Sequence, residues 1–213
     1  MSNSTDRTVR ISKLFSRILR HGLHDYPTLK MDEGGSVRLD ALLALHEFHK
    51  YHISDTFVQR MVSDDSKGRF TLEDRAGHLY IRANQGHSKH VGDLLILEKI
   101  LSPIQDAQEI PVLIHGTTPH AWRLIRESGL NRMRRSHIHF STGVVGIDPT
   151  VKSGMRQTAR IHIYVNVPKC MESGMKFFRS TNNVILSDGL NGSIPPEYFL
   201  KVIDHDSNTV IYP

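Results

Sequence analysis

The spacing of hydrophobic residues changes along this chain of 213 residues, and that change limits the folds it can adopt. In the first part, apolar residues recur every three or four positions, which is typical of helices that bury one face. They are Ile11, Leu14, Phe15, Ile18 and Leu19, and later Phe57, Val58, Met61 and Val62. In the second half, apolar and polar residues alternate from Ile161 to Val167, which indicates a strand with one buried face. With so few helices there, the pattern predicts an α+β protein rather than a doubly wound parallel sheet.

The first part reads as three helices followed by a hairpin. Residues 1–9 are polar and are expected to be a frayed tail, and a helix follows that ends at Gly22. A second helix is expected over residues 39–48 and a third over 55–62, with Ser54 as its N-cap. Short strands at 69–72 and 79–81 are joined by the turn residues 74–77. This order outlines a winged helix.

Residues 83–92 are polar and contain two glycines, so we place a domain boundary between residues 88 and 89. The predicted domains are 1–88 and 89–213. In the second domain, strands are expected at 112–114, 161–167, 184–186 and 210–212, with a helix over 121–127 that stops at Gly129. This favours an antiparallel-rich sheet.

Composition excludes several classes of protein. Cys170 is the single cysteine, which rules out an internal disulfide framework and a cysteine-rich zinc site. No apolar run is long enough to span a bilayer, and the first ten residues carry no apolar segment of a secretory signal. We therefore expect a soluble intracellular protein, cytoplasmic or nuclear. The net charge of +5 mildly favours a polyanionic partner.

Several arginines and histidines stand where an anion site would need them. Arg20 and His21 end the first helix, Arg69 opens the hairpin, and Arg156 lies in a glycine-bearing loop. For each of them the alternative is an ordinary surface charge, since most charged residues lie in solvent. If the arginines converge, they form a pocket for a phosphate dianion, because guanidinium groups alone would repel one another.

Nucleotide and metal motifs of the common kinds are absent. The sequence has no GxGxxG after a strand, no GxxxxGK[ST] and no HExxH. His137 and His139 share one strand face, as paired metal ligands do, but no third ligand is evident, so we predict no metal site. Structural histidines are the default interpretation, and imidazoles lining a nucleotide cleft are the alternative.

Seven segments occur together in an order that resembles the NAD-dependent tRNA 2′-phosphotransferases. The most specific is Arg82-Ala83-Asn84-Gln85-Gly86-His87-Ser88. The others are Leu19-Arg20-His21-Gly22, Lys67-Gly68-Arg69-Phe70, His115-Gly116-Thr117, His137-Ile138-His139, Ser153-Gly154-Met155-Arg156 and Phe178-Arg179-Ser180. The resemblance runs from about residue 11 to residue 203.

The resemblance implies an N-terminal winged-helix lobe and a C-terminal ADP-ribosyltransferase-like lobe with a split sheet. It implies that NAD is consumed to remove an internal 2′-phosphate from RNA, such as ligated tRNA, through an RNA-2′-phospho-ADP-ribose. The products would be 2′-hydroxyl RNA, ADP-ribose 1″,2″-cyclic phosphate and nicotinamide. The family's active set falls on Arg20, His21, Arg69 and Arg156.

For the NAD cleft, the resemblance and the adjoining motifs together predict a larger set of contacts. It consists of Asn84, Gln85, His115, Gly116, Thr117, His139, Ser141, Arg179 and Ser180. Guanidinium groups would neutralise the phosphate in place of a metal. We expect a monomer that binds RNA and NAD and no membrane.

The sequence is also compatible with two other functions. One is ADP-ribosylation that stops after the first step, on terminal phosphates of nucleic acid or on protein, which product analysis would distinguish. The other is a non-catalytic winged-helix protein that binds nucleic acid. The intact Arg-His-Arg-Arg set argues against it, because duplex binding needs only a basic face.

Overall fold

The chain forms two units, Met1–Ile100 and Leu101–Pro213, each with its own hydrophobic core. The structure is a computed structural model that describes residues 2–213, with side chains from Asp6 onward. Both units combine helices with antiparallel strands, so the protein is α+β as the sequence predicts.

The first unit is helical at its start and ends in a hairpin. Its elements are α1 (Ser2–Arg17), the π-helical turn η1 (Ile18–Gly22), the 3₁₀ turn η2 (Leu23–Asp25), β1 (Ser36–Arg38), α2 (Leu39–Leu43), α3 (His46–His49), α4 (Asp55–Ser63), β2 (Phe70–Arg75), β3 (His78–Ala83), α5 (Lys89–Gly92) and η3 (Leu97–Lys99). The sheet order is β1-β3-β2, with both pairings antiparallel.

Local signals place α4 and the hairpin correctly. Ser54 caps α4 by accepting a hydrogen bond from Phe57 N (3.2 Å). The β2–β3 turn passes through Ala76 and Gly77, which both have positive φ, and Asp74 accepts from Gly77 N (2.9 Å). Two consecutive residues of positive φ suit the right-handed twist of a two-residue hairpin turn.

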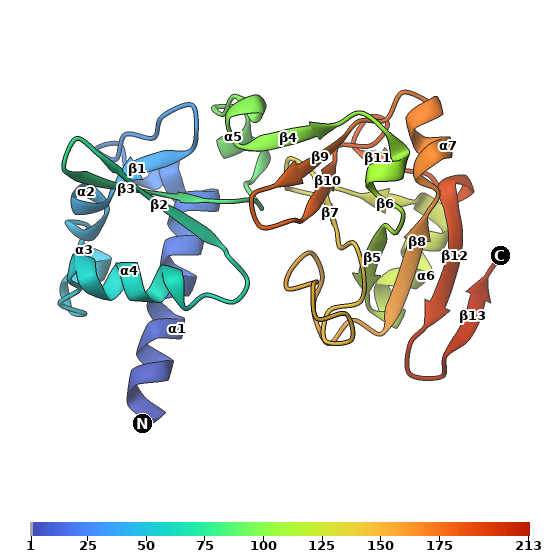
Figure 1. Cartoon of the computed structure of the whole chain (residues 1–213), viewed down its shortest axis with the longest axis horizontal. Helices are drawn as coiled ribbons and strands as arrows, with labels where there is room; N and C mark the ends of the chain where they lie inside the picture. The colour runs from blue at the N-terminus through green and yellow to red at the C-terminus, as the bar shows by residue number, and fades with distance from the viewer. Residues whose placement is uncertain (1) are drawn as a thin grey trace. The chain divides into compact units, whose positions relative to one another are not determined.

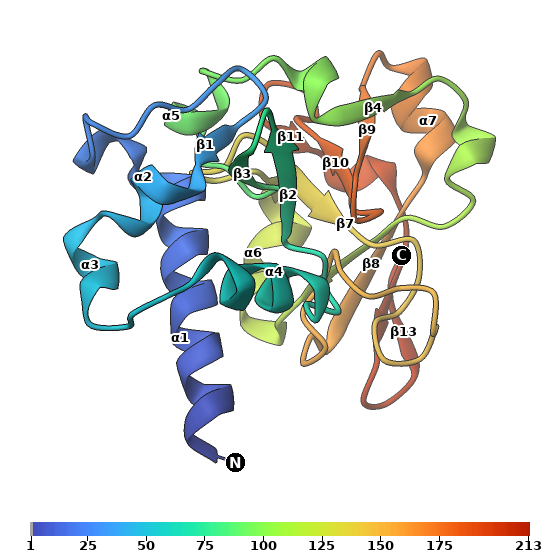
Figure 2. The same ribbon diagram turned by 60° about the vertical axis from the view of Figure 1, so that its left-hand side comes forward.

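The expected frayed tail is wrong, because α1 already begins at Ser2 and its N-terminal end projects beyond the rest of the unit (Figures 1 and 2). Two contacts distant in sequence stabilise the start of the helix, because Arg7 donates to Tyr51 O and lies over the Phe57 ring at 4.7 Å. A local ion pair also joins Arg10 to Asp6 at 2.6 Å. The partners of Arg7, Tyr51 and Phe57, cannot be recognised from residues 1–9 alone.

The single helix expected over residues 39–48 is also wrong. Leu45 adopts an extended conformation with ψ 141° and separates α2 from α3. In one straight helix Phe48 would lie about 180° around the axis from Leu39, given about 100° per residue. Both side chains are buried in the same core, at 1% exposure each, and the break allows this.

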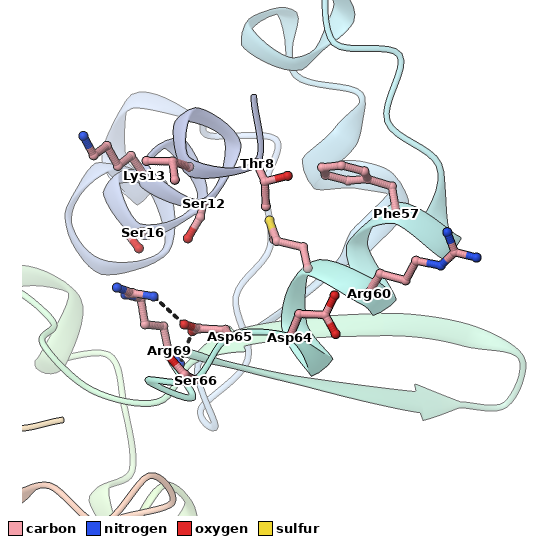
Figure 3. Close-up of a pocket in the computed structure, with 12 residues that line it drawn as sticks. Thr8, Ser12, Lys13, Ser16, Phe57, Arg60, Asp64, Asp65, Ser66 and Arg69 are labelled. Atoms are coloured by element: carbon pink, nitrogen blue, oxygen red, sulfur yellow. Dashed lines mark hydrogen bonds and ion pairs between the residues drawn. The ribbon is translucent and has the colours of Figure 1, made fainter. Parts of the chain in front are cut away.

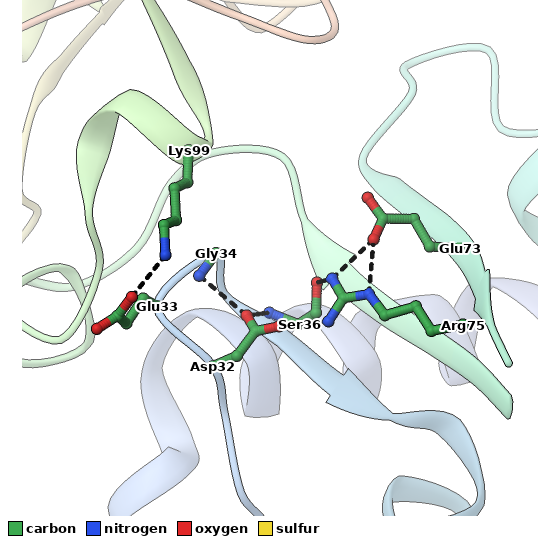
Figure 4. A network of polar contacts seen from close by, with 7 residues as sticks. All are labelled: Asp32, Glu33, Gly34, Ser36, Glu73, Arg75 and Lys99. Atoms are coloured by element: carbon green, nitrogen blue, oxygen red, sulfur yellow. Dashed lines mark hydrogen bonds and ion pairs between the residues drawn. The ribbon is translucent and has the colours of Figure 1, made fainter.

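The segment from α5 to η3 belongs to the first unit, so the division falls after the predicted boundary at residues 88 and 89. Ile96 N donates to Glu33 O (2.9 Å), and Lys99 pairs with Glu33 at 2.6 Å. The same loop is tied to the hairpin, because Asp32 pairs with Arg75 at 2.6 Å (Figure 4). These contacts hold residues 89–99 against the loop that precedes β1.

The second unit contains two four-stranded antiparallel sheets. Its elements are β4 (Leu101–Ile104), η4 (Ala107–Glu109), β5 (Ile114–Thr117), α6 (Pro119–Ser128), β6 (Leu130–Asn131), β7 (Ile138–Phe140), β8 (Ile161–Val165), α7 (Val167–Glu172), β9 (Phe177–Ser180), β10 (Ile185–Ser187), β11 (Ser193–Ile194), η5 (Pro196–Tyr198), β12 (Phe199–Asp204) and β13 (Thr209–Tyr212). The sheet orders are β4-β9-β10-β7 and β13-β12-β8-β5, with a small β11-β6 pair.

Three details of the second unit differ from the sequence prediction. Strand β5 starts at Ile114, and Val112 is 38% exposed. Val167 begins α7 instead of ending the strand, because Asn166 caps that helix by accepting from Lys169 N (3.1 Å). His162 on β8 is 2% exposed, so both faces of this strand are covered. Among residues 2–213, no helix has the length and apolarity required to cross a membrane.

Candidate functional site

Arg20 and His21 lie on the π-helical turn that follows α1. The turn is anchored by Ile18 and Leu19, which are fully buried, while Arg20 is half-buried and His21 is exposed. A π-type turn advances the side chains differently from an α-helix and is frequent at functional sites. Here Ile18 and Leu19 enter the core, while the side chains of Arg20 and His21 stay outside it.

Segment 84–88 packs against Arg20. Gly86 has φ +86°, and a Cβ there would lie 3.5 Å from the Cδ, Nε and Cζ atoms of Arg20. Ser88 donates to Arg20 O from both its backbone N (2.9 Å) and its Oγ (3.2 Å). The Arg20 Nε and Nη2 atoms are shielded from solvent. The backbone at Gly86 thus lies in contact with the Arg20 side chain.

Arg69 lies beside a pocket of about 570 Å³ between α1 and α4 (Figure 3). Its guanidinium pairs with Asp65, whose side chain is 9% exposed, and Arg69 N donates to the same carboxylate (2.7 Å). Ser12 and Ser16 of α1 line the pocket, and both point toward Arg69. Asp65 therefore presets the orientation of Arg69 before any ligand binds.

Asn84 is buried at 3% exposure and connects the hairpin to the Arg69 loop. Its Nδ2 donates to Gly68 O (2.8 Å), its Oδ1 accepts from Thr71 Oγ1 (2.7 Å), and its backbone N donates to Arg69 O (2.9 Å). These bonds position the backbone of Arg69. The predicted NAD contact of Asn84 stays a prediction, as does that of the half-buried Gln85.

In the second unit, His115 and His139 meet where the two larger sheets come together. β5 and the end of β7 are joined by the bridge between Ile114 and Ser141, with two N–H···O bonds of 2.9 Å. His115 Nδ1 donates to His139 O (2.9 Å), and His139 Nδ1 donates to His137 O (3.0 Å). Because each Nδ1 carries the proton, each Nε2 presents a lone pair. His139 Nε2 is buried and has no hydrogen-bond partner in the described chain.

Gly116 and Gly154 bring the loop of Arg156 onto the same strands. A Cβ on Gly116 would lie 2.5 Å from Met155 Cε and 2.8 Å from Ala159 Cβ, and one on Gly154 would lie 2.5 Å from Phe140 O. Ser141 Oγ donates to Met155 Sδ (3.1 Å). Met155 is thus fixed between β5 and β7, and the exposed Arg156 follows it directly.

Arg135 adds a second positive charge near Arg156. Desolvation and the charge of Arg156 lower the pKa of Arg135. Burial lowers the pKa of His115, and burial together with the charge of Arg135 lowers the pKa of His139 well below 6.5. Two guanidinium groups and two neutral imidazoles therefore share this part of the second unit.

The other predicted NAD residues are engaged within the fold. Arg179 Nη2 donates to Glu109 O (2.9 Å), and Ser180 Oγ lies 3.0 Å from both the N and O of Val184. Ser141 is fully buried, and Thr117 is half-buried at the end of β5. Arg179 and Ser180 lie on β9, which is separated from the strand of His139, β7, by β10. Their contact with NAD stays a prediction.

Residues 6–189 match the family model of the RNA 2′-phosphotransferases, the Tpt1 / KptA family. This chain belongs to that family. It is 42% identical to tRNA 2′-phosphotransferase 1 of Bos taurus over 202 residues, which are 93% of the chain and 76% of the relative. It is 34% identical to tRNA 2′-phosphotransferase of Saccharomyces cerevisiae over 204 residues, 92% of the chain and 84% of the relative.

The relatives differ in length. The chain is 37% identical to a Schizosaccharomyces pombe protein over 203 residues, which are 95% of the chain and 53% of that protein. It thus spans about half the length of this relative. The matched span 6–189 contains Arg20, His21 and Arg69 of the first unit and His115, His139 and Arg156 of the second.

Two charged residues near the predicted site were not among the sequence predictions. Asp65 orients Arg69, and its position four residues earlier was the available signal. Arg135 belongs to the basic run 132–135 just before His137, which was the other signal. In residues 2–213, no group of three or more His, Cys, Asp or Glu side chains is arranged to hold a metal ion.

Replacing Gly116 by alanine should disturb the loop that carries Arg156. The new Cβ would overlap Met155 and Ala159, and overpacking of this kind costs about 1–3 kcal/mol. We expect the free energy of unfolding to fall by that amount in urea denaturation. Gly34→Ala is the matched control, since its Cβ would meet only Asp32 Oδ1 at 3.3 Å, and neither glycine has positive φ. Equal losses in the two variants would contradict this packing role.

Buried imidazoles should make the protein less stable in mild acid. The pKa values of His115, His137, His139 and His162 are all lowered, in each case first by burial. Below about pH 6.5 the unfolded chain therefore binds more protons than the folded one, and stability decreases as the pH falls. The expected slope is about 1.4 kcal/mol per pH unit for each histidine in that range.

Urea unfolding at a series of pH values measures this slope. His162→Gln removes one of the four imidazoles and keeps a side-chain donor toward Ala159 O. Its free energy of unfolding should therefore change with pH less steeply, by about 1.4 kcal/mol per pH unit. Stability that rises as the pH falls below about 6.5 would contradict the assignment of neutral buried imidazoles.

Proposed function

We propose that the protein removes an internal 2′-phosphate from RNA and consumes NAD in doing so. The observation that carries this proposal is the family match over residues 6–189, which includes all four residues of the Arg-His-Arg-Arg set. The relatives from Bos taurus and Saccharomyces cerevisiae are named for tRNA, which supports ligated tRNA as the substrate. We further propose an intracellular monomer.

The finer fold assignments are part of the same proposal. We assign the first unit to the winged-helix class, which its helices and its β1-β3-β2 sheet support. We assign the second unit to the ADP-ribosyltransferase type, which its two antiparallel sheets and the Ile114–Ser141 bridge support.

For the phosphate, we assign Arg20, His21, Arg69 and Arg156 as the catalytic residues. Guanidinium groups donate in a fixed fork that suits phosphate oxygens. The packing of Arg20 on Gly86 and the Asp65 contact of Arg69 support preset donors, which lose little entropy when a phosphate binds. Asn84 acts as a positioning residue for Arg69.

For NAD, we assign the histidine pair of the second unit. His139 Nε2 is a buried acceptor without a partner in the described chain, which suits a ligand hydroxyl or amide as donor. The lowered pKa values of His115 and His139 support neutral rings at pH 7. Neutral imidazole rings do not repel the positive charge of the nicotinamide riboside. Arg135 supplies a positive charge for the diphosphate of NAD. We propose that the other residues predicted from the sequence for the NAD cleft contact NAD as well.

The reaction then has two steps. A 2′-phosphate oxygen bonds to ribose C1″, the C1″–N bond breaks, and nicotinamide leaves with the electron pair. The ribose 2″-hydroxyl next attacks phosphorus, the bond from phosphorus to RNA O2′ breaks, and the hydroxyl proton ends on O2′. Arginines stabilise the charge on the nonbridging oxygens, and His21 holds the proton in transit.

The test uses a short internally 2′-phosphorylated RNA with and without NAD. We expect loss of the phosphate, nicotinamide release and ADP-ribose 1″,2″-cyclic phosphate only when NAD is present. EDTA should leave the rate unchanged, since the proposed neutralising groups are guanidiniums. A stable ADP-ribosylated adduct as the end product would instead indicate transfer that stops after the first step. Loss of activity in EDTA that magnesium restores would contradict the arginine-based mechanism.

A further inference from the structure

Another pocket of the first unit has four lysine and arginine side chains in its lining. It has a volume of about 640 Å³ and lies between α1 and the α3 region. We call it the basic groove, and its charged and ring-bearing lining residues are Arg10, Lys13, Arg17, His46, Glu47, His49, Lys50 and Tyr51. The lining thus contains four permanently charged cations and one carboxylate, that of Glu47.

Three of the cations form a row along α1, and the fourth lies on the opposite side of the groove. Arg10, Lys13 and Arg17 are spaced i, i+3 and i+7, which places them on one face of α1 over about 10 Å. Lys50 follows α3 on the other side, with its Nζ 5.1 Å from the centre of the Tyr51 ring. A row of charges along a helix matches the repeating charge of a nucleic-acid backbone better than a single bound ion.

The acidic partners do not neutralise this groove. Glu47 accepts a hydrogen bond from the Tyr26 hydroxyl and lies 3.9 Å from Arg17. Arg10 pairs with Asp6, but both side chains are more than half exposed, at 66% and 57%. Exposed pairs of this kind contribute little energy and exchange readily for other anions. An excess of positive charge therefore remains for a ligand.

The basic groove is linked to the proposed phosphate site through Lys13. This residue lines both the groove and the pocket that contains Arg69 (Figure 3). A polyanion that reaches Arg69 along α1 therefore has further cations within reach on the other side of Lys13. Continuity with Arg69 favours RNA over an acidic protein as the occupant.

We propose that the basic groove binds the ribose-phosphate backbone of the RNA substrate away from its 2′-phosphate. This inference rests on the proposed function, because it takes Arg69 as a phosphate ligand. The groove discriminates between long and short RNA, since only a chain that extends past Lys13 gains its contacts. It adds affinity for the body of the RNA and takes no part in the bond changes.

The test compares two double variants of the full chain in titrations with a folded tRNA over a range of salt. Arg10→Gln/Lys50→Gln removes two groove charges, one from each side. Lys30→Gln/Lys176→Gln removes two exposed charges elsewhere and is the matched control. In the groove variant, the plot of log affinity against log salt should be shallower by about 1.4–1.8, and tRNA affinity should fall about tenfold or more near 0.1 M salt. The control should keep the wild-type slope.

A 2′-phosphorylated trinucleotide separates this inference from the proposed function. We expect the groove variant to lose rate on 2′-phosphorylated tRNA relative to the trinucleotide, through KM and not kcat. A wild-type salt slope in the groove variant, or equal losses on both substrates, would overturn the groove as an RNA site. Failure of the wild-type protein to process either RNA would overturn the proposed function, while the binding titration still decides the groove.

Discussion

Replacement of Arg69 by lysine is expected to slow phosphate removal nearly as much as replacement by alanine. Lysine keeps the charge, but it has no planar fork with which to contact Asp65 and a phosphate at once. The side chain of Arg69 is 34% exposed and that of its partner Asp65 is 9% exposed, so one edge of the guanidinium is committed inside the fold. The edge that remains is available for the ligand.

The expected deficit is about 3–4 kcal/mol in transition-state stabilisation, or a hundredfold or more in rate. Single-turnover kinetics of the wild type, Arg69→Lys and Arg69→Ala measure it, beside an NAD titration that should change little. Arg60→Lys is the matched control, because Arg60 lines the same pocket but is exposed and points away from Arg69 in Figure 3. A rate of Arg69→Lys near that of the wild type would contradict a bidentate contact between Arg69 and the phosphate. An alanine variant that lost NAD binding but kept RNA binding would assign Arg69 to the other substrate.

Elements with strong local signals were predictable from the sequence. Ser54 begins α4, residues 74–77 turn the hairpin, and Gly129 with φ +81° ends α6. The break between α2 and α3 was not predictable, because it depends on Leu39 and Phe48 sharing a core. The start of α1 depends on Tyr51 and Phe57, more than forty residues away. Local propensity carries no information about such partners.

The candidate site shows the same division between chemistry and geometry. Sequence motifs singled out Arg20, Arg69 and Arg156 because of their side-chain chemistry. The groups that position them are visible only as contacts in space. Gly86 lies against Arg20, Asn84 bonds to Gly68 O, and Gly116 admits Met155 next to Arg156. A glycine or asparagine in a motif has several uses, and only packing distinguishes a ligand contact from a structural one.

Alanine substitution of Arg156 or His21 should separate the two chemical steps. Departure of nicotinamide builds positive charge at ribose C1″, and these side chains are not assigned to that centre. Attack on phosphorus increases charge on the nonbridging oxygens and requires a proton transfer, which are the tasks assigned to Arg156 and His21. The second step should therefore slow by about a hundredfold or more, while the first slows much less.

The intermediate RNA-2′-phospho-ADP-ribose should then accumulate, and a denaturing gel of a labelled RNA would resolve it as a retarded band. Lys152→Ala and His24→Ala are matched controls, since both residues are near the tested ones in sequence but are exposed and have no assigned role. Both controls should show no such band. Uniform slowing of both steps in Arg156→Ala and His21→Ala would contradict these roles without affecting the proposed reaction. Accumulation in Arg156→Ala alone would assign the second step to the arginine and leave the proton transfer to a group other than His21.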